Sequence, residues 1–192
     1  MPNDRMPEPI DTSNSASILQ EIDELESLFL QCRSVFPTLD PGLLGHQEFS
    51  TAPYYLRRGY KARIQLQDPI TPEFMERHKR MGKWINENAI IRLHGIMHYH
   101  GFLETMTDQD KKLPGAREVD LMRRMRNAFT KTQLNYRPTD PENVELRSQV
   151  ISHFAIRSEE FPEGEIPTPI NTVVEPIFKG CRNYVSAKTK QA

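Results

Sequence analysis

Apolar residues recur at helical spacing over most of this chain. The first regular stripe consists of Ile18, Ile22, Leu25 and Phe29. This spacing places all four on one face of a helix, which we expect over residues 17–35 with Ser17 as its N-cap. Residues 1–16 contain three prolines and mostly small polar residues. That composition predicts a disordered N-terminus.

A second and longer helical pattern starts at residue 71. Thr71-Pro72-Glu73 combines an N-cap residue, a proline for the first helical position and an acid for the first turn. The pattern then continues to about residue 103 with two apolar stripes: Ile85, Ala89, Leu93, Ile96 and Leu103 on one, and Trp84, Ile91 and Phe102 on the other. Such wide apolar coverage predicts a central buried helix or a helix shared with a second subunit.

Three more helices are expected in the C-terminal half. One covers residues 116–135, one starts at Asp140-Pro141, and one starts at Thr168-Pro169 with a kink at Pro176. The apolar stripe of the last helix consists of Ile170, Val173, Ile177, Cys181 and Tyr184. Residues 37–70 are rich in proline, glycine and aromatic residues without a sustained period, so we expect an irregular segment with a short strand pair around residues 60–66. Residues 187–192 should fray.

The pattern as a whole predicts an all-α protein. We expect an antiparallel helical bundle over residues 71–186, preceded by an irregular N-terminal extension, the helix and loop segment 17–70. A chain of 192 residues has room for one compact domain. Its mean hydropathy is −0.64, and no apolar run is long enough for a membrane span. Two cysteines do not make a disulfide framework, so a cytoplasmic setting is the default.

The near-neutral net charge of −1 hides an asymmetry along the chain. Residues 1–50 hold nine acids and two bases, whereas residues 51–83 hold eight bases and three acids. The basic block begins with Arg57, Arg58 and Lys61, which are interleaved with tyrosines. Such a mixture is typical of surfaces that stack bases and contact phosphates. A solvated face is the commoner explanation of such a run, and pairing with the acidic segment of the same chain is a further alternative.

The most specific stretch is RMRNAFTKTQLNY, residues 124–136. An apolar stripe of Val119, Met122, Met125 and Phe129 runs through the helix that contains it. Arg126 lies at the edge of that stripe, where its guanidinium needs an anion or hydrogen-bond acceptors, because a buried unpaired charge is costly. Asn127 has as its helical neighbours the bases Arg123, Arg124 and Lys131. The sequence therefore predicts a cationic, hydrogen-bonding ledge on one helix.

The order of these elements resembles the HEPN superfamily, an all-α group that includes ribonucleases of toxin–antitoxin and antiphage defence systems. The resemblance covers residues 73–186 and rests on a long apolar helix followed by a helix that carries Arg126-Asn127. The family motif continues with a histidine a few residues later. Here Lys131, Thr132 and Gln133 stand in its place. Tyr136 occupies a position where some members have a tyrosine.

The resemblance implies a homodimer that binds RNA and cleaves it without a metal or another cofactor, through attack of the ribose 2′-hydroxyl on the adjacent phosphate. Arg126 would contact the phosphate, Asn127 would orient it, and Lys131 or Tyr136 would assist. Arg123, Arg124 and the basic-block residues would add RNA contacts. A histidine from elsewhere, such as His98 or His153, is an alternative proton carrier. The competing hypothesis is a non-catalytic module that dimerises or docks on a protein partner.

Two further motifs suggest metal chemistry less strongly. His94, His98 and His100 form an H-x3-H-x-H pattern, in which the first two share a helix face. Histidines that pack at helix interfaces are the commoner explanation of such a pattern. Asp110-Lys111-Lys112 contains the D-x-K element of metal-dependent nucleases, but it falls in a loop between helices, and that chemistry needs a second acid on a strand. No metal site is therefore expected.

Overall fold

The computed structural model describes residues 13–104, 106–135 and 139–191, with side chains over 15–104, 106–130 and 139–191. Most of these residues are helical. The helices are α1 (Ser13–Val35), α2 (Pro53–Leu56), α3 (Pro72–Tyr99), α4 (Ala116–Asn135), α5 (Pro141–His153) and α6 (Glu175–Thr189). A two-stranded antiparallel sheet is formed by β1 (Glu48–Ser50) and β2 (Arg63–Gln65). The all-α prediction is confirmed.

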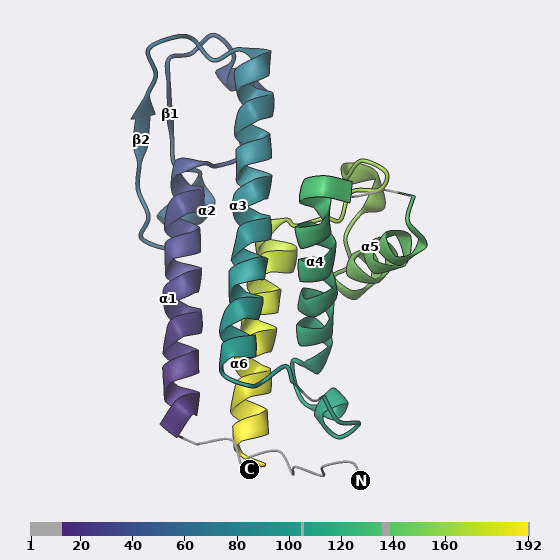
Figure 1. Cartoon of the computed structure of the whole chain (residues 1–192). Coiled ribbons are helices and arrows are strands. Elements are labelled where there is room, and N and C mark those ends of the chain that lie inside the picture. Colours follow the sequence, from purple (N-terminus) through teal and green to yellow (C-terminus); the bar gives the residue numbers. More distant parts are fainter. Residues whose placement is uncertain (1–12, 105, 136–138, 192) are drawn as a thin grey trace.

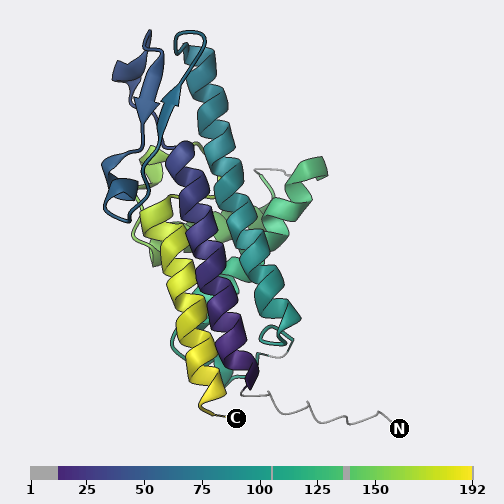
Figure 2. The ribbon, with the colours of Figure 1, turned by 90° about the vertical axis from the view of Figure 1, so that its left-hand side faces the viewer.

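Four long helices form an antiparallel bundle (Figure 1). Contacts join α1 to α3, α3 to α4, α4 to α6 and α6 back to α1, so the helices close a ring. The chain runs in opposite directions in each adjacent pair, as in up-and-down four-helix bundles. α5 lies to one side of α4, and the small sheet lies beside the N-terminal half of α3 (Figure 2). Among the described residues, no helix has the length and apolarity needed to cross a membrane.

The core consists of the apolar stripes that the sequence shows. Ile18, Ile22 and Phe29 of α1 are buried, and so are all four stripe residues of α4 and most of those of α6. These side chains belong to one continuous cluster. The apolar pattern predicts a bundle over residues 71–186 that does not include segment 17–70. In the structure, α1 packs in the same core as α3 and α6. The bundle needs α1 because its stripe covers the apolar faces of both neighbours.

Helix boundaries follow capping chemistry where a cap was predicted. The Thr71 hydroxyl accepts a hydrogen bond from the Phe74 N–H at 3.2 Å, and α3 begins at Pro72. Asp140 accepts one from the Glu142 N–H at 3.0 Å, and α5 begins at Pro141. Ser17 is not a cap, since α1 already begins at Ser13.

The C-terminus differs from the sequence prediction in two ways. Residues 187–189 were expected to fray, but α6 continues to Thr189. The Lys188 ammonium lies 3.3 Å from the Asp110 carboxylate, which ties this last turn to the loop before α4. The expected kink at Pro176 takes the form of a wide π-helical turn, Ile170–Val174, just before α6. Because proline has no N–H to donate, the helix can adopt this wider turn at its start.

Two details of the N-terminal half also differ. The expected strand pair around residues 60–66 is only half correct, because β2 pairs with β1 from an earlier segment, with Phe49 opposite Ile64. Trp84 was placed on a second apolar stripe of α3, yet its side chain is 54% exposed. The bundle covers α3 along Ala89, Leu93 and Met97. It therefore leaves the Trp84 side of this helix in solvent.

Candidate functional site

The buried stripe of α4 determines where its arginines point. Met122 and Met125 are fully buried between α3 and α6. Each helical residue turns by about 100°, so Arg123, Arg124 and Arg126 leave the helix in three different directions. The structure therefore divides the single cationic ledge that the sequence predicts, and each arginine meets different neighbours.

Arg124 faces α5, where its guanidinium contacts one amide and one carboxylate side chain. Its guanidinium donates to the Gln149 side-chain oxygen at 2.5 Å and lies 3.7 Å from the Glu145 carboxylate. The predicted role of Arg124 as an RNA contact stays a prediction. An arginine in such a network fixes α5 against α4.

Arg126 has no acidic partner among the described residues. Its guanidinium is half-buried and donates to the Asn127 side-chain oxygen at 3.1 Å. Asn127 is exposed and also lines a cavity of about 330 Å³ between α4 and α5. The predicted pairing of these two residues is present, with Asn127 holding the arginine from one side. The remaining guanidinium donors can take an anion.

His94 on α3 faces the same seam. Burial, and then the nearby charges of Arg126, His98 and Arg123, lower the pKa of His94 to about 4. The ring is therefore neutral at physiological pH. His98 stacks on it with ring centroids 6.1 Å apart and planes at 14°. We call these four residues, His94, His98, Arg123 and Arg126, the α3–α4 seam.

The α3–α4 seam contains two histidines of α3, whereas no histidine follows Arg126-Asn127 on α4. The sequence pointed to His98 or His153 as proton carriers from outside the motif. His98 is in the seam, whereas His153 binds the Glu118 carboxylate at 2.9 Å on another side of α4. His94 was considered only as a metal ligand. In the sequence, the only indication for His94 was its spacing of four residues from His98. The packing of α3 on α4 is what brings His94 close to Arg123 and Arg126.

The three histidines of the H-x3-H-x-H pattern do not converge. The His100 ring lies 2.9 Å from the Glu21 carboxylate of α1, away from the stacked pair. Within the described residues, no group of three or more histidine, cysteine or acidic side chains could hold a metal ion. Asp110 of the D-x-K element accepts hydrogen bonds from the Thr107 N–H and hydroxyl at 2.9 and 3.0 Å. It organises the loop before α4.

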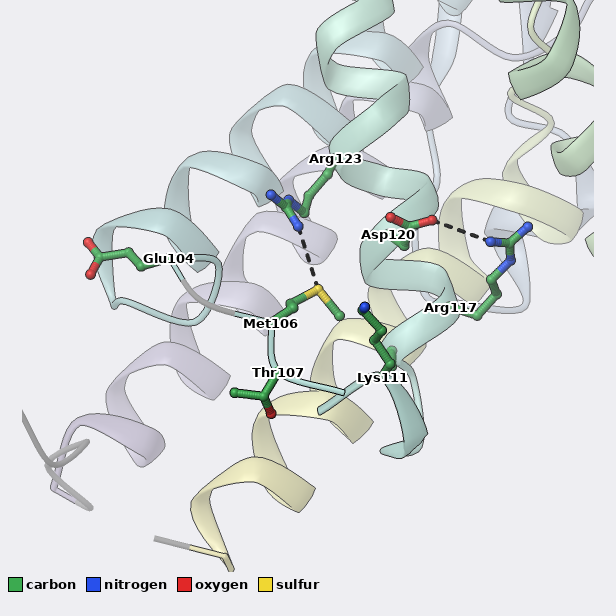
Figure 3. Close-up of a pocket in the computed structure, with 8 residues that line it drawn as sticks. Glu104, Met106, Thr107, Lys111, Arg117, Asp120 and Arg123 are labelled. Atoms are coloured by element: carbon green, nitrogen blue, oxygen red, sulfur yellow. Dashed lines mark hydrogen bonds and ion pairs between the residues drawn. The ribbon is translucent and has the colours of Figure 1, made fainter. Parts of the chain in front are cut away.

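A cavity of about 650 Å³ adjoins the seam at Arg123 (Figure 3). The Arg123 guanidinium reaches toward Met106 and lies 3.6 Å from its sulfur. On the same face of α4, Arg117 pairs with Asp120 at 3.3 Å. Arg123, like Arg126, has no ion-pair partner in the described part of the chain. The volume is in the range of small-molecule sites, roughly 300–1,000 Å³.

Three of the eight bases of the basic block, Arg58, Arg63 and Lys83, form ion pairs with described residues of the same molecule. Arg58 pairs with Glu175 of α6 at 2.7 Å and lies over the Tyr54 ring at 5.0 Å. The Tyr54 hydroxyl donates to the same carboxylate, and the Tyr55 side chain is buried. The charge of Arg58 is thus matched within the molecule, and its predicted RNA contact stays a prediction. Arg57 and Lys61 remain exposed on the loop after α2.

Two predicted residues cannot be placed. Lys131 lies on α4, one helical turn after Asn127, but its side chain falls outside the described set. Tyr136 lies outside the described residues altogether. Their assisting roles stay predictions.

Comparison with known proteins gives no further guide to this site. No protein family model, no curated protein and no solved structure matches the chain. The arguments below therefore rest on the geometry of the chain itself.

Proposed function

We propose that this protein binds RNA at the α3–α4 seam and cleaves it by metal-independent phosphodiester transfer, as the resemblance to HEPN ribonucleases implies. The observation that carries the proposal is the convergence of a histidine with two arginines that have no acidic partner among the described residues. A phosphodiester would match the charge of Arg123 and Arg126. Fixed cations of this kind stabilise the additional negative charge of a phosphorane transition state.

His94 would accept the proton in the first step. The ribose 2′-oxygen attacks the adjacent phosphorus, its proton passes to the unprotonated His94 nitrogen, and the bond from phosphorus to the 5′-oxygen breaks. The leaving oxygen takes a proton from His98 or from water. The products are a 2′,3′-cyclic phosphate and a 5′-hydroxyl. A bound phosphate offsets the arginine charges that lower the pKa of His94, so this nitrogen becomes a better base in the complex.

Cleavage of single-stranded RNA in EDTA tests the proposal. Wild type should release fragments with 2′,3′-cyclic phosphate ends and leave the 2′-deoxy analogue intact. We expect Arg126→Ala and His94→Ala each to slow cleavage by about 10²–10⁴-fold, the usual contribution of a proton-transfer or charge-stabilising group. Arg157→Ala is the matched control, because Arg157 is exposed beyond α5 and away from the seam. If wild type and Arg126→Ala leave RNA equally intact, the proposal is wrong.

A second candidate function, a non-catalytic dimerising module, is favoured by the outer face of α3. Met81, Trp84 and Ile91 of α3 follow one another at spacings of three and seven residues, the spacing of apolar a and d positions in paired helices. Met81 and Trp84 are 43% and 54% exposed. A second copy of this chain is the proposed occupant, since the exposed apolar faces of two copies can cover each other. Intact RNA together with a stable dimer would favour this function over catalysis.

A further inference from the structure

The cavity beside Arg123 combines cationic and anionic side chains from two segments of the chain. Asp120 and Arg123 belong to α4, and Lys111 belongs to the loop that precedes this helix (Figure 3). Arg123 stands three positions before Arg126, about one helical turn away along α4. Because Arg123 belongs both to the cavity and to the α3–α4 seam, a molecule bound at the seam can extend into the cavity.

Asp120 provides a hydrogen-bond acceptor at this cavity. Its Oδ2 atom accepts a hydrogen bond from Arg117 at 3.3 Å, and its other carboxylate oxygen points away from Arg117 (Figure 3). The Asp120 side chain is 41% exposed, so a ligand can reach the carboxylate. An ionised carboxylate has acceptor sites on both oxygens and no donor. The bond to Arg117 therefore leaves Asp120 able to accept from N–H groups of a ligand.

A hydrogen-bond donor lies near this acceptor. The Lys111 ammonium donates to the Asp108 carboxylate at 2.8 Å, and an ammonium has three N–H donors, so it can also donate to a ligand. The hydrogen bond to Asp108 raises the pKa of Lys111, and the nearby charge of Asp120 raises it further. The cavity thus offers a charged donor and a charged acceptor close to each other.

The cavity also has an apolar wall. Met106 and Ala116 line it, and the Met106 sulfur lies 3.6 Å from the Arg123 guanidinium. A methionine side chain is flexible and polarizable, and its sulfur makes favourable contacts with aromatic rings. The volume of about 650 Å³ is in the range that accommodates small planar ligands. A flat ring with a polar edge would match this combination of walls.

We propose that this cavity binds the guanine base of the RNA nucleotide next to the scissile phosphate, an inference that rests on the function proposed for the α3–α4 seam. Lys111 would donate to guanine O6, and Asp120 would accept from guanine N1–H and from the amino group on C2. Met106 would pack on the ring. Among the four RNA bases, only guanine has two adjacent N–H donors beside an acceptor on its Watson–Crick edge, the edge by which unpaired RNA bases are read. Each of the other bases would make one hydrogen bond fewer to Asp120.

Titration calorimetry on the full chain tests base recognition without cleavage. The probes are the 3′- and 5′-monophosphates of guanosine, inosine and adenosine. In at least one of the two series, the guanosine nucleotide should bind about 10–100-fold more tightly than the adenosine nucleotide, the usual value of a hydrogen bond to a charged group. The inosine nucleotide lacks the amino group on C2 and should bind with intermediate affinity. Equal affinities for guanosine and adenosine nucleotides in both series would overturn the proposal.

Asp120→Asn should abolish the preference for guanine, because an amide group replaces one acceptor oxygen with a donor. Asp68→Asn, at an exposed position before α3, is the matched control and should keep the preference. The ratio of the guanosine and adenosine affinities is the readout, so a loss of stability that weakens both equally does not imitate the effect. Lys111→Met should also reduce this ratio, which keeps the test if the Asp120 variant misfolds. An unchanged ratio in both variants would overturn the proposal.

RNA cleavage separates this proposal from the function on which it rests. Wild type should cut single-stranded RNA next to guanosines, whereas Asp120→Asn should cut next to all four bases more evenly. Selective binding of guanosine monophosphate with RNA left intact would support the guanine site and contradict the proposed cleavage. Cleavage next to all bases alike, with no preference among the mononucleotides, would overturn the guanine site and leave the proposed cleavage standing.

Discussion

Arg124 and Arg126 are separated by one residue, yet their guanidinium groups have different fates. Two helical positions correspond to about 200° of rotation, so Arg124 meets the acceptors of α5 and Arg126 meets the seam with α3. The number of charged residues along the sequence does not show which arginine is paired within the molecule and which is available to a ligand. What decides whether an arginine is available to a ligand is the acid that tertiary packing brings to it.

The altered pKa of His94 makes stability depend on pH. Its pKa is about 4 in the folded protein, against an ordinary value of 6.5. Between these values the unfolded chain binds more protons, so the free energy of unfolding should decrease as pH falls from about 6.5 to about 4. The full shift corresponds to about 3 kcal/mol, which solvent screening at this half-buried site reduces to about 1–2 kcal/mol.

Urea unfolding at a series of pH values measures this dependence. His94→Gln should flatten the decrease between pH 6.5 and 4, whereas His46→Gln, at an exposed position, should keep it. An unchanged slope in His94→Gln would mean that the seam does not hold this ring in its neutral form.

At the scale of elements, two glycines allow a close approach of α4 and α6. Gly115, just before α4, has a positive φ of 86°, and a Cβ atom there would lie 1.9 Å from the Gly180 carbonyl oxygen of α6. A Cβ at Gly180 would in turn lie 2.3 Å from the Glu118 Cβ. α4 and α6 can pack this tightly only because both positions lack a side chain.

Gly115→Ala should therefore destabilise the protein strongly. Backbone strain at positive φ costs about 1–2 kcal/mol, and overpacking adds about 1–3 kcal/mol, so the free energy of unfolding should fall by about 2–5 kcal/mol in urea titrations. Gly95→Ala is the matched control. Nothing lies within 4 Å of a Cβ at this site on α3, and helix propensity should raise stability by about 0.5–1 kcal/mol. Equal effects of the two variants would contradict the packing described for α4 and α6.

At the scale of the whole molecule, the bundle leaves one long helix incompletely covered. α3 contacts α1 on one side and α4 on the other, and its Met81–Trp84 face stays in solvent. Exposed aromatic and methionine side chains are enriched at the centres of protein interfaces. This face is the reason to expect that the molecule functions as a dimer.

We predict a homodimer in sedimentation or light-scattering measurements. Trp84→Ala should raise its dissociation constant by at least about 30-fold, the effect of losing a 2 kcal/mol interface residue, with little change in the unfolding of each monomer. Leu28→Ala on α1, where the side chain is 59% exposed, should leave association unchanged. A wild-type protein that stays monomeric at all concentrations would rule out the dimer.

The sequence alone predicted the helices other than the short α2, because each depends on local information. Apolar spacing gave the stripes of α1, α4 and α6, and short-range capping chemistry gave the starts of α3 and α5 at Pro72 and Pro141. Arg126-Asn127 was also found this way, since an arginine beside an apolar stripe is visible at helical spacing. These features need only the neighbours within one or two helical turns.

Only the tertiary structure decided which charges are matched and which are left for a ligand. Arg58 pairs with Glu175, which lies 117 positions later in the sequence, and His94 lies near the arginines of α4 although it belongs to another helix. Arg33 is buried with no ion pair to any described acid. The physical reason is that the cost of burying a charge depends on groups brought together from distant segments. The positions of those groups follow from the packing of whole helices, which no local pattern specifies.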